Sequence, residues 1–312
     1  MLFGYRQMEW NRIDMSEWLL IIFTMIVQSS VGLVLMSVLY IYWFKHELNT
    51  WSHSVTLLVQ KIVLRALLVS SVLAGIGLIA SLNILGYPFS VYHSLRNVMQ
   101  KWINIETTFA AIYFGLLALY TIYVVVRKRA HVYIMLAIGI VGLINIHYMA
   151  IIYVNSAMIT WTNVNTYFLF YGAVFTLGPA LAVSFIGYPL RKSIRGALPV
   201  KLVMAALFVV FISVTVRLIE HPAYMEWLAG VAMMNDNIIF PHQTELNIKS
   251  AFGLKMLSWC LSIIAMASWT YALWKGKDNL LINNYYSILM GSTFIFIAEV
   301  VNQYTFFIMC NV

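Results

Sequence analysis

Residues 62–86 read IVLRALLVSSVLAGIGLIASLNILG, and this stretch decides the fold class. It holds a single charged residue, Arg65, and as a helix it would extend about 37 Å, which exceeds the roughly 30 Å of a bilayer's hydrocarbon core. Seven comparable apolar stretches cover residues 17–44, 105–126, 132–154, 166–189, 199–219, 251–274 and 282–309. The pattern predicts an all-α, polytopic transmembrane bundle of about eight helices. We expect one membrane domain over residues 1–312, with 221–250 as its longest connection and the place for a short interfacial helix.

The composition excludes a soluble domain. Hydrophobic residues make up 62% of the chain and charged residues 10%, whereas soluble domains average about 45–50% apolar and 25% charged. The net charge of +8 lies in short connections and forms no basic helix, which argues against a nucleic-acid partner. Both cysteines, Cys260 and Cys310, fall in predicted spans, so the sequence predicts neither a disulfide framework nor a metal motif. Residues 1–18 lack the short apolar core of a cleaved signal peptide.

Basic residues lie on one side of the predicted bundle. The opposite side has few of them, Arg6, Arg12, Arg96 and Arg217. Since short cytoplasmic loops are rich in Lys and Arg, we expect the basic side to be cytoplasmic and both termini to face outward. The basic side holds Lys45, Lys61, Arg127, Lys128, Arg129, Arg191, Lys192, Arg195, Lys201, Lys275 and Lys277.

Three carboxylates belong to predicted spans, where an ionisable group costs about 2.5 kcal/mol or more and is first read as functional. Glu17 opens the first span, Glu106 opens the third, and Glu299 lies past the middle of the eighth. All three should lie in the outer half of the bundle, where they could accept or relay protons from a small molecule. A helix N-cap is the structural alternative for Glu17, and to a lesser degree for Glu106.

Histidines bear on whether the chain holds its own haem, because a bis-His haem needs two imidazoles on facing helices. Only His147 lies clearly inside a predicted span, and the others, including His93 and His221, fall in connections or at interfaces. We therefore expect no haem in this chain. His147 could hydrogen-bond a ligand, although a helix-to-helix contact is the commoner role for such a residue.

The exit of the second predicted helix is the most distinctive stretch. Residues 75–108 read GIGLIASLNILGYPFSVYHSLRNVMQKWINIETT, where a helix should end at Gly86 and Pro88 forces a turn. A polar and aromatic connection then leads to Glu106. The stretch predicts a pocket at the membrane edge, with an ordinary helix exit as the alternative.

Several motifs together resemble one family, the membrane-anchor subunits of dimethyl sulfoxide reductase. The similarity extends over nearly the whole chain and rests on the order and spacing of the motifs. They are SEWLLIIFTMIVQSSVG at 16–32, GIGLIASLNILGYP at 75–88, HSLRNV at 93–98, Glu106, TWTNVNTYFLFYGAVFTLG at 160–178 and IAEVVNQYTFF at 297–307.

The resemblance implies eight spans, termini in the periplasm and a multi-pass, quinol-oxidising subunit of an anaerobic respiratory complex in the bacterial inner membrane. Such a subunit oxidises menaquinol and passes electrons to an iron–sulfur subunit, which supplies a molybdopterin catalytic subunit. The clusters and the molybdopterin belong to those partners, and the family's anchor holds no haem. Glu106 matches the family's acidic residue after the loop, and the other matching positions are Glu17, Gln28, Ser81, Gly86, Pro88, Trp161 and Glu299.

Departures from the family pattern bear on the quinol site. The family has a His two residues before the Gly of its HLGxP motif, where this chain has Ile84, and an Arg two residues after the Pro, where it has Ser90. Asn302 and Gln303 replace the usual Gly-Arg after Glu299. Since Ile cannot donate or accept a proton, we expect Asn83, His93 or His147 to supply the hydrogen bond that the family His gives, with Glu106 as proton acceptor. The candidates for quinol contact are Ser81, Asn83, His93, Arg96 and His147, with Glu17, Gln28 and Glu299.

Three other functions remain open from the sequence. A proton-coupled secondary transporter would use Glu106 and Glu299 as coupling groups, but the chain shows no inverted repeat. An anchor without its own quinol site is consistent with the loss of the family His. The anchor of a polysulfide or tetrathionate reductase would differ only in the terminal acceptor, which the catalytic subunit sets.

Overall fold

A computed structural model describes residues 2–48, 53–84, 102–156, 159–187, 197–236, 243–275 and 284–308. Apart from short turns, these residues form helices, and eight of the helices are long and apolar enough to span a membrane, which confirms the all-α fold and the number of spans. The chain is thus a multi-pass membrane protein. The spanning helices are α1 (Leu2–Leu48), α2 (His53–Ile84), α4 (Trp102–Arg127), α5 (Val132–Val154), α6 (Asn165–Ala182), α8 (Ala197–Asp236), α9 (Gln243–Lys275) and α11 (Tyr285–Ile308).

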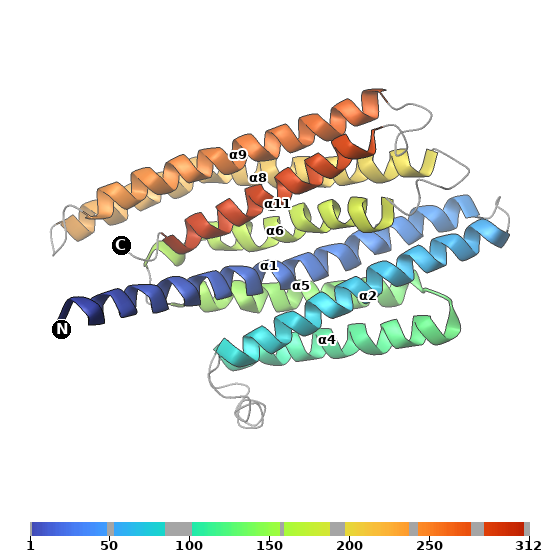
Figure 1. Cartoon of the computed structure of the whole chain (residues 1–312), viewed down its shortest axis with the longest axis horizontal. Helices are drawn as coiled ribbons and strands as arrows, with labels where there is room; N and C mark the ends of the chain where they lie inside the picture. Colours follow the sequence, from blue (N-terminus) through green and yellow to red (C-terminus); the bar gives the residue numbers. More distant parts are fainter. Residues whose placement is uncertain are drawn as a thin grey trace.

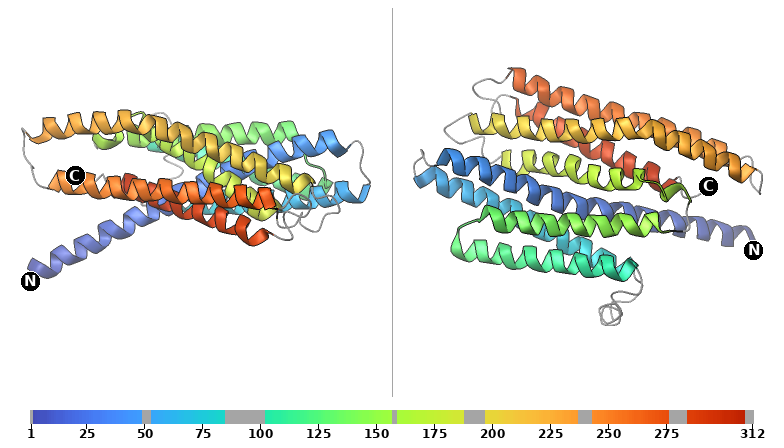
Figure 2. Two further views of the ribbon diagram at one scale, coloured as in Figure 1. Left: turned by 90° about the horizontal axis from the view of Figure 1, so that it is seen from above. Right: turned by 180° about the vertical axis from the view of Figure 1, so that it is seen from behind.

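Helix α1 runs through the middle of the bundle, with α2, α4 and α5 on one side and α6, α8, α9 and α11 on the other (Figure 1). Figure 2 shows the same layered arrangement from above and from behind. Trp18 of α1 stacks on Tyr304 of α11 with ring centroids 5.1 Å apart. The described chain therefore starts and finishes at one end of the bundle. We name this end the η1 end, after the short 3-10 helix Ile159–Trp161 that lies there, and the opposite end the Lys128 end.

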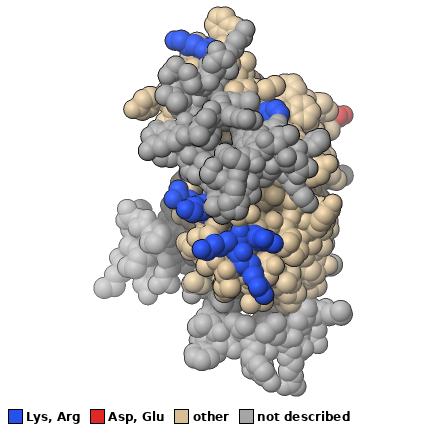
Figure 3. All heavy atoms as spheres, turned by 90° about the vertical axis from the view of Figure 1, so that its right-hand side faces the viewer, with Lys and Arg blue, Asp and Glu red and all other residues tan. Residues whose placement is uncertain are grey.

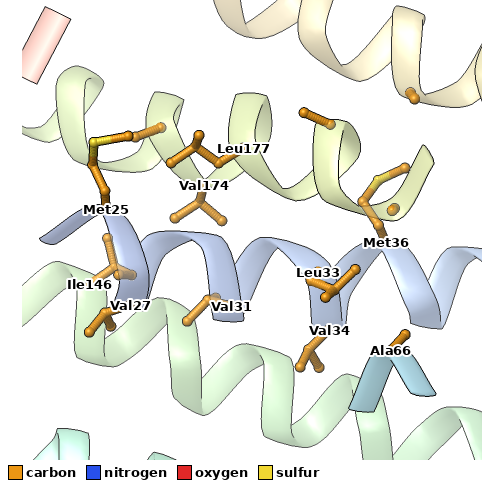
Figure 4. Packing of buried hydrophobic residues seen from close by; sticks show 14 of the residues in the cluster. Met25, Val27, Val31, Leu33, Val34, Met36, Ala66, Ile146, Val174 and Leu177 are labelled. Atoms are coloured by element: carbon orange, nitrogen blue, oxygen red, sulfur yellow. The ribbon is translucent and has the colours of Figure 1, made fainter. Parts of the chain in front are cut away.

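The core is built on both faces of α1. Val27 and Val31 of α1 pack beside Ile146 of α5, while Val174 and Leu177 of α6 cover the other side (Figure 4). Lipid tails are as apolar as these side chains, so helices in a membrane associate by close packing rather than by removal of apolar surface from water. Close packing on both faces therefore holds α1 at the centre of the bundle.

Two glycines allow α1 and α6 to approach each other at backbone distance. A Cβ built on Gly178 would fall among the backbone atoms of Gly32, and one on Gly32 would meet the Val174 carbonyl oxygen. Small residues at a helix crossing permit this close contact. The crossing fixes where α6 lies relative to the central helix.

We expect Gly178→Leu to force α1 and α6 apart and to destabilise the bundle. Overpacking a tight contact costs about 1–3 kcal/mol, which should lower the midpoint of thermal denaturation in detergent by several degrees. Gly115→Leu is the matched control, because a Cβ on Gly115 of α4 meets nothing within 4 Å. Equal denaturation temperatures for the two variants would contradict the assigned crossing.

Prolines lie inside two of the helices without ending them. Pro179 lies within α6, which continues into a π-helical turn, η2 (Val183–Gly187), and Pro222 lies within α8. Membrane helices tolerate proline because neighbouring helices and local π adjustments satisfy the freed backbone groups. The predicted end of the sixth span at residue 219 is therefore wrong, since α8 continues to Asp236. The expected connection over 221–250 is also wrong, because residues 221–236 continue α8 and residues 243–250 begin α9.

Basic side chains gather at the Lys128 end. Figure 3 views this end and shows Lys and Arg on its surface. In the spanning helices and the α4–α5 turn, the exposed basic residues at this end are Lys61, Arg65, Arg127, Lys128, Arg129, Lys201 and Lys275. Which side of the membrane this end faces stays a prediction from the charge rule.

Candidate functional site

Glu106 lies in a small polar cluster between α2 and α4 at the η1 end. It is 5% exposed, and its Oε2 accepts long hydrogen bonds of 3.4 Å from the Ser81 and Thr107 hydroxyls. Those two hydroxyl oxygens are 3.4 Å apart. The other carboxylate oxygen, Oε1, is buried and has no hydrogen-bond partner among the described residues. One half of this carboxylate is thus free for a ligand or a water molecule.

The spacing along α4 explains why Glu106 faces inward. Glu106, Ala110, Tyr113 and Leu117 recur every three or four residues and are all buried. Tyr113 on this stripe shares a 2.9 Å hydrogen bond with Ser30 of α1, which donates to the Ser70 carbonyl of α2 at 2.8 Å. The stripe holds α4 against α1 and α2, and so fixes the position of Glu106.

Gln28 and Gln303 join α1 to α11 in the core. Both are fully buried, and the Gln303 amide donates to Gln28 Oε1 over 3.3 Å. Gln28 Nε2 and Gln303 Oε1 have no partner within the described part of the chain. Gln28, expected to contact quinol, therefore makes its polar contact with α11.

Glu299 forms a buried ion pair that the sequence does not reveal. The Arg217 guanidinium of α8 binds it through both terminal nitrogens, with Nη1–Oε2 at 2.9 Å and Nη2–Oε1 at 3.1 Å. Thr176 of α6 donates to Oε2 at 2.9 Å, and Asn302 donates to Oε1 at 3.3 Å. Glu299 lies eight residues before the end of its span at Phe307, or about 12 Å. This bidentate geometry holds Glu299 as a charged partner and leaves it less suited than Glu106 to accept a proton.

Lys255 of α9 extends the ion pair into a network. It is 7% exposed and donates to Asn302 Oδ1. It also interacts electrostatically with Arg217, Glu220 and Glu299. Two cations and two carboxylates balance each other here, which limits the cost of burying them. The network connects α8, α9 and α11.

Glu106 and Glu299, two of the three carboxylates expected in the outer half of the bundle, belong to separate clusters. Glu106 contacts α2, whereas Glu299 contacts α6, α8 and its own helix. Figure 1 shows α4 and α11 on opposite sides of α1. A direct proton relay between the two carboxylates therefore has no support in the fold.

The histidines differ from the expectation. His221 is not in a connection, because it lies inside the spanning part of α8, is 4% exposed and packs edge-on against Trp259 at 4.6 Å. His147 is exposed on α5 and stacks on Tyr167 of α6 at 5.3 Å. Its neighbour Tyr148 instead stacks on Phe109 of α4 at 4.6 Å. His147 thus turns toward α6 and away from the Glu106 cluster.

Some of the expected site residues are brought together and others are not described. Ser81 joins Glu106, as the exit of the second helix predicts. Glu17 lies well inside α1, which begins at Leu2, so it does not cap this helix. Asn83 lies in the last turn of α2, but its side chain is outside the described residues, as are His93 and Arg96 with the whole connection 85–101.

Arg217 and Lys255 are the residues that sequence reasoning missed. Both lie inside stretches predicted to span the membrane, and a buried cation in a span is itself a signal of a partner. His221 was missed because Pro222 suggests the end of a helix. Within the described ranges, no three His, Cys, Asp or Glu side chains are placed to hold a metal ion.

Comparisons with known proteins point to one group. The family model described as DMSO reductase anchor subunit (DmsC) matches residues 12–308. The protein is 28% identical over 176 residues to the anaerobic dimethyl sulfoxide reductase protein YnfH of Escherichia coli (strain K12). It is also 28% identical over 171 residues to the C subunit of anaerobic dimethyl sulfoxide reductase from Haemophilus influenzae. Each alignment covers 54% of this protein and 57% of the relative, so the match spans little more than half of these proteins. No solved structure matches it.

Proposed function

Because the chain belongs to the DMSO reductase anchor subunit family, as its motifs predict, we propose that it anchors a molybdenum reductase in the membrane and oxidises menaquinol for it. The electrons pass to an iron–sulfur partner and from there to a molybdopterin catalytic subunit. The membrane in question is the bacterial inner membrane. Both relatives are described as parts of an anaerobic dimethyl sulfoxide reductase, which supports this class of complex.

The observation that carries the quinol assignment is the half-satisfied Glu106 carboxylate. It is buried at the η1 end, at the second residue of its span, where a quinol headgroup can approach from the membrane edge. Leaving a buried carboxylate oxygen unpaired costs free energy. A quinol hydroxyl donating to Oε1 would remove that cost, so the arrangement favours a hydroxyl-bearing ligand.

The chemistry separates protons from electrons. Quinol becomes quinone by losing two electrons and two protons. Glu106 Oε1 accepts one hydroxyl proton as general base, the second proton passes to water at the membrane edge, and the Ser81 and Thr107 hydroxyls hold Oε2 in place. The electrons leave for the partner, whose docking surface should therefore lie at the η1 end, near Glu106.

The second hydrogen bond to quinol needs a donor in place of the family His, since this chain has Ile84. His147 of α5 stacks on Tyr167 of α6, away from the Glu106 cluster, so it is poorly placed for this role. Asn83 is in the last turn of α2, two residues after Ser81, and His93 follows in the connection. We assign the replacement role to Asn83 or His93.

A transporter and a purely structural anchor are the competing functions. The separation of Glu106 from Glu299 removes the paired coupling site that a transporter would use. A structural anchor would have no use for an unpaired carboxylate oxygen at the membrane edge. Both differences favour a quinol-oxidising anchor.

Co-purification tests the proposed function directly. The protein should be isolated from its native membranes in mild detergent, and the accompanying proteins identified. We expect an iron–sulfur protein and a molybdopterin protein in stoichiometric amounts. A stable protein that purifies alone would contradict the proposal, and so would a complex that lacks iron and molybdenum.

A further inference from the structure

A cavity of about 390 Å³ lies between α6 and α8, apart from the Glu106 cluster. Its walls include Phe168, Tyr171 and Phe175 of α6, and Val209, Ser213 and Arg217 of α8. Small-molecule pockets typically measure about 300–1,000 Å³ and combine apolar walls with a few polar groups. This cavity matches both criteria.

The cavity is accessible from the lipid. Phe175, Ile212 and Val216 line it and are 38%, 45% and 40% exposed on the outside of the bundle. In a membrane-spanning bundle, such exposed apolar side chains face lipid tails. A ligand entering here must therefore be soluble in the hydrocarbon.

The lining of the cavity is almost entirely apolar, and we call its two hydrogen-bonding side chains from α8, Arg217 and Ser213, its floor. Arg217 Nε donates to the Phe168 carbonyl at 3.2 Å and Nη2 to the Leu169 carbonyl at 2.8 Å, in addition to its two bonds with Glu299. A guanidinium has five N–H groups, so these four bonds leave one, on Nη1. The Ser213 hydroxyl donates to the Gly172 carbonyl at 3.1 Å, and its oxygen can still accept.

Gly172 makes room for this floor. A Cβ at this position would collide with the Arg217 guanidinium. The guanidinium is thereby held against α6 with only 11% of the side chain exposed. Because the guanidinium is held in one orientation, its remaining N–H has a fixed direction, which suits a ligand with one well-placed acceptor.

The Arg217–Glu299 ion pair at the floor favours a ligand whose hydrogen-bond acceptor is uncharged. Arg217 is already paired with the Glu299 carboxylate, so an anionic phosphate headgroup would meet that negative charge as well as the guanidinium. A ring carbonyl accepts a hydrogen bond without bringing charge. Aromatic walls provide stacking surfaces for a planar ring. Tyr171 in this wall also contacts His147, which stacks on Tyr167.

We propose that the α6/α8 cavity is a second binding position for an isoprenoid quinone, whose ring carbonyl accepts from Arg217. The inference rests on the proposed function, because it takes quinone to be the substrate of this subunit, but it concerns a different site. Glu106 lies on the α2/α4 side of α1, whereas the cavity lies on the α6/α8 side. Only binding is assigned to the cavity, with no redox step.

Photoaffinity labelling of the intact complex tests this proposal. The probe is a menaquinone analogue with an azide on its naphthoquinone ring, and labelled peptides are located by mass spectrometry. We expect label in residues 168–175 or 209–217, in the wild type and in Glu106→Gln alike, with displacement by unlabelled menaquinone. Val209→Trp should fill the cavity and reduce this label about tenfold or more. Phe208→Trp is the matched control, because Phe208 is on the same helix and is 64% exposed to lipid.

Absence of label from both segments overturns the proposal, as does equal labelling in Val209→Trp and Phe208→Trp. Displacement by excess phospholipid but not by menaquinone would identify a lipid site instead, and also overturns it. Quinol-driven cluster reduction, measured in the same preparations, reports on Glu106 separately. Failure of the proposed function is therefore distinguishable from failure of the second site.

Discussion

Replacing Glu106 by Gln is expected to abolish most menaquinol-dependent turnover while leaving the complex assembled. Gln keeps the shape and the hydrogen bonds of the side chain to Ser81 and Thr107, but it cannot take a proton. Loss of a general base typically costs about 10²–10⁴ in rate. The measurement is the steady-state rate with a menaquinol analogue in purified complex.

Two controls show whether the loss is specific to quinol oxidation at Glu106. An artificial reductant that supplies the catalytic subunit directly should give equal turnover in Glu106→Gln and the wild type. Glu226→Gln, a carboxylate of α8 exposed on the surface, should keep full quinol-dependent activity. Unchanged quinol-dependent activity in Glu106→Gln would remove Glu106 from the mechanism.

Replacing Glu299 by Ala is expected to destabilise the whole bundle rather than a single step of the reaction. The change leaves the buried Arg217 without its partner, and breaking one side of a buried ion pair costs about 3–5 kcal/mol. The variant should accumulate poorly in the membrane, and its thermal denaturation in detergent should begin at a clearly lower temperature. Glu226→Gln again serves as the carboxylate control.

A double variant separates charge from packing in this network. Replacing Glu299 by Leu and Arg217 by Met together removes both buried charges, and such replacements are often neutral or stabilising. We expect the double variant to recover much of the stability that Glu299→Ala loses. A loss of denaturation temperature in the double variant equal to the sum of the losses in Glu299→Leu and Arg217→Met alone would contradict the ion pair as the cause.

Much of the fold could be predicted from the sequence, because span length is a local property. Eight apolar stretches predicted eight spanning helices, and their starts agree within a few residues. The main error concerns α8, because a proline such as Pro222 usually ends a helix in a soluble protein. In a membrane no water is present to bond an exposed backbone, so the helix persists through the proline.

The site could be predicted only where its residues are close in sequence. Ser81 and Glu106 flank one connection, so the helix exit was enough to bring them together. Gln28 and Gln303 meet across 275 positions, and Arg217 meets Glu299 across 82. Such contacts depend on which helices pack together, which hydropathy does not encode. The buried charge of Arg217 and Lys255 signals a partner but not its identity.

Electrons from menaquinol should enter the reductase through this subunit. The most direct measurement adds menaquinol anaerobically to the oxidised complex, without terminal acceptor, and follows the paramagnetic signal of the reduced iron–sulfur clusters. We expect the signal to develop in the intact complex and to be absent from a preparation stripped of this subunit. Equal reduction of the clusters with and without the subunit would contradict the claim.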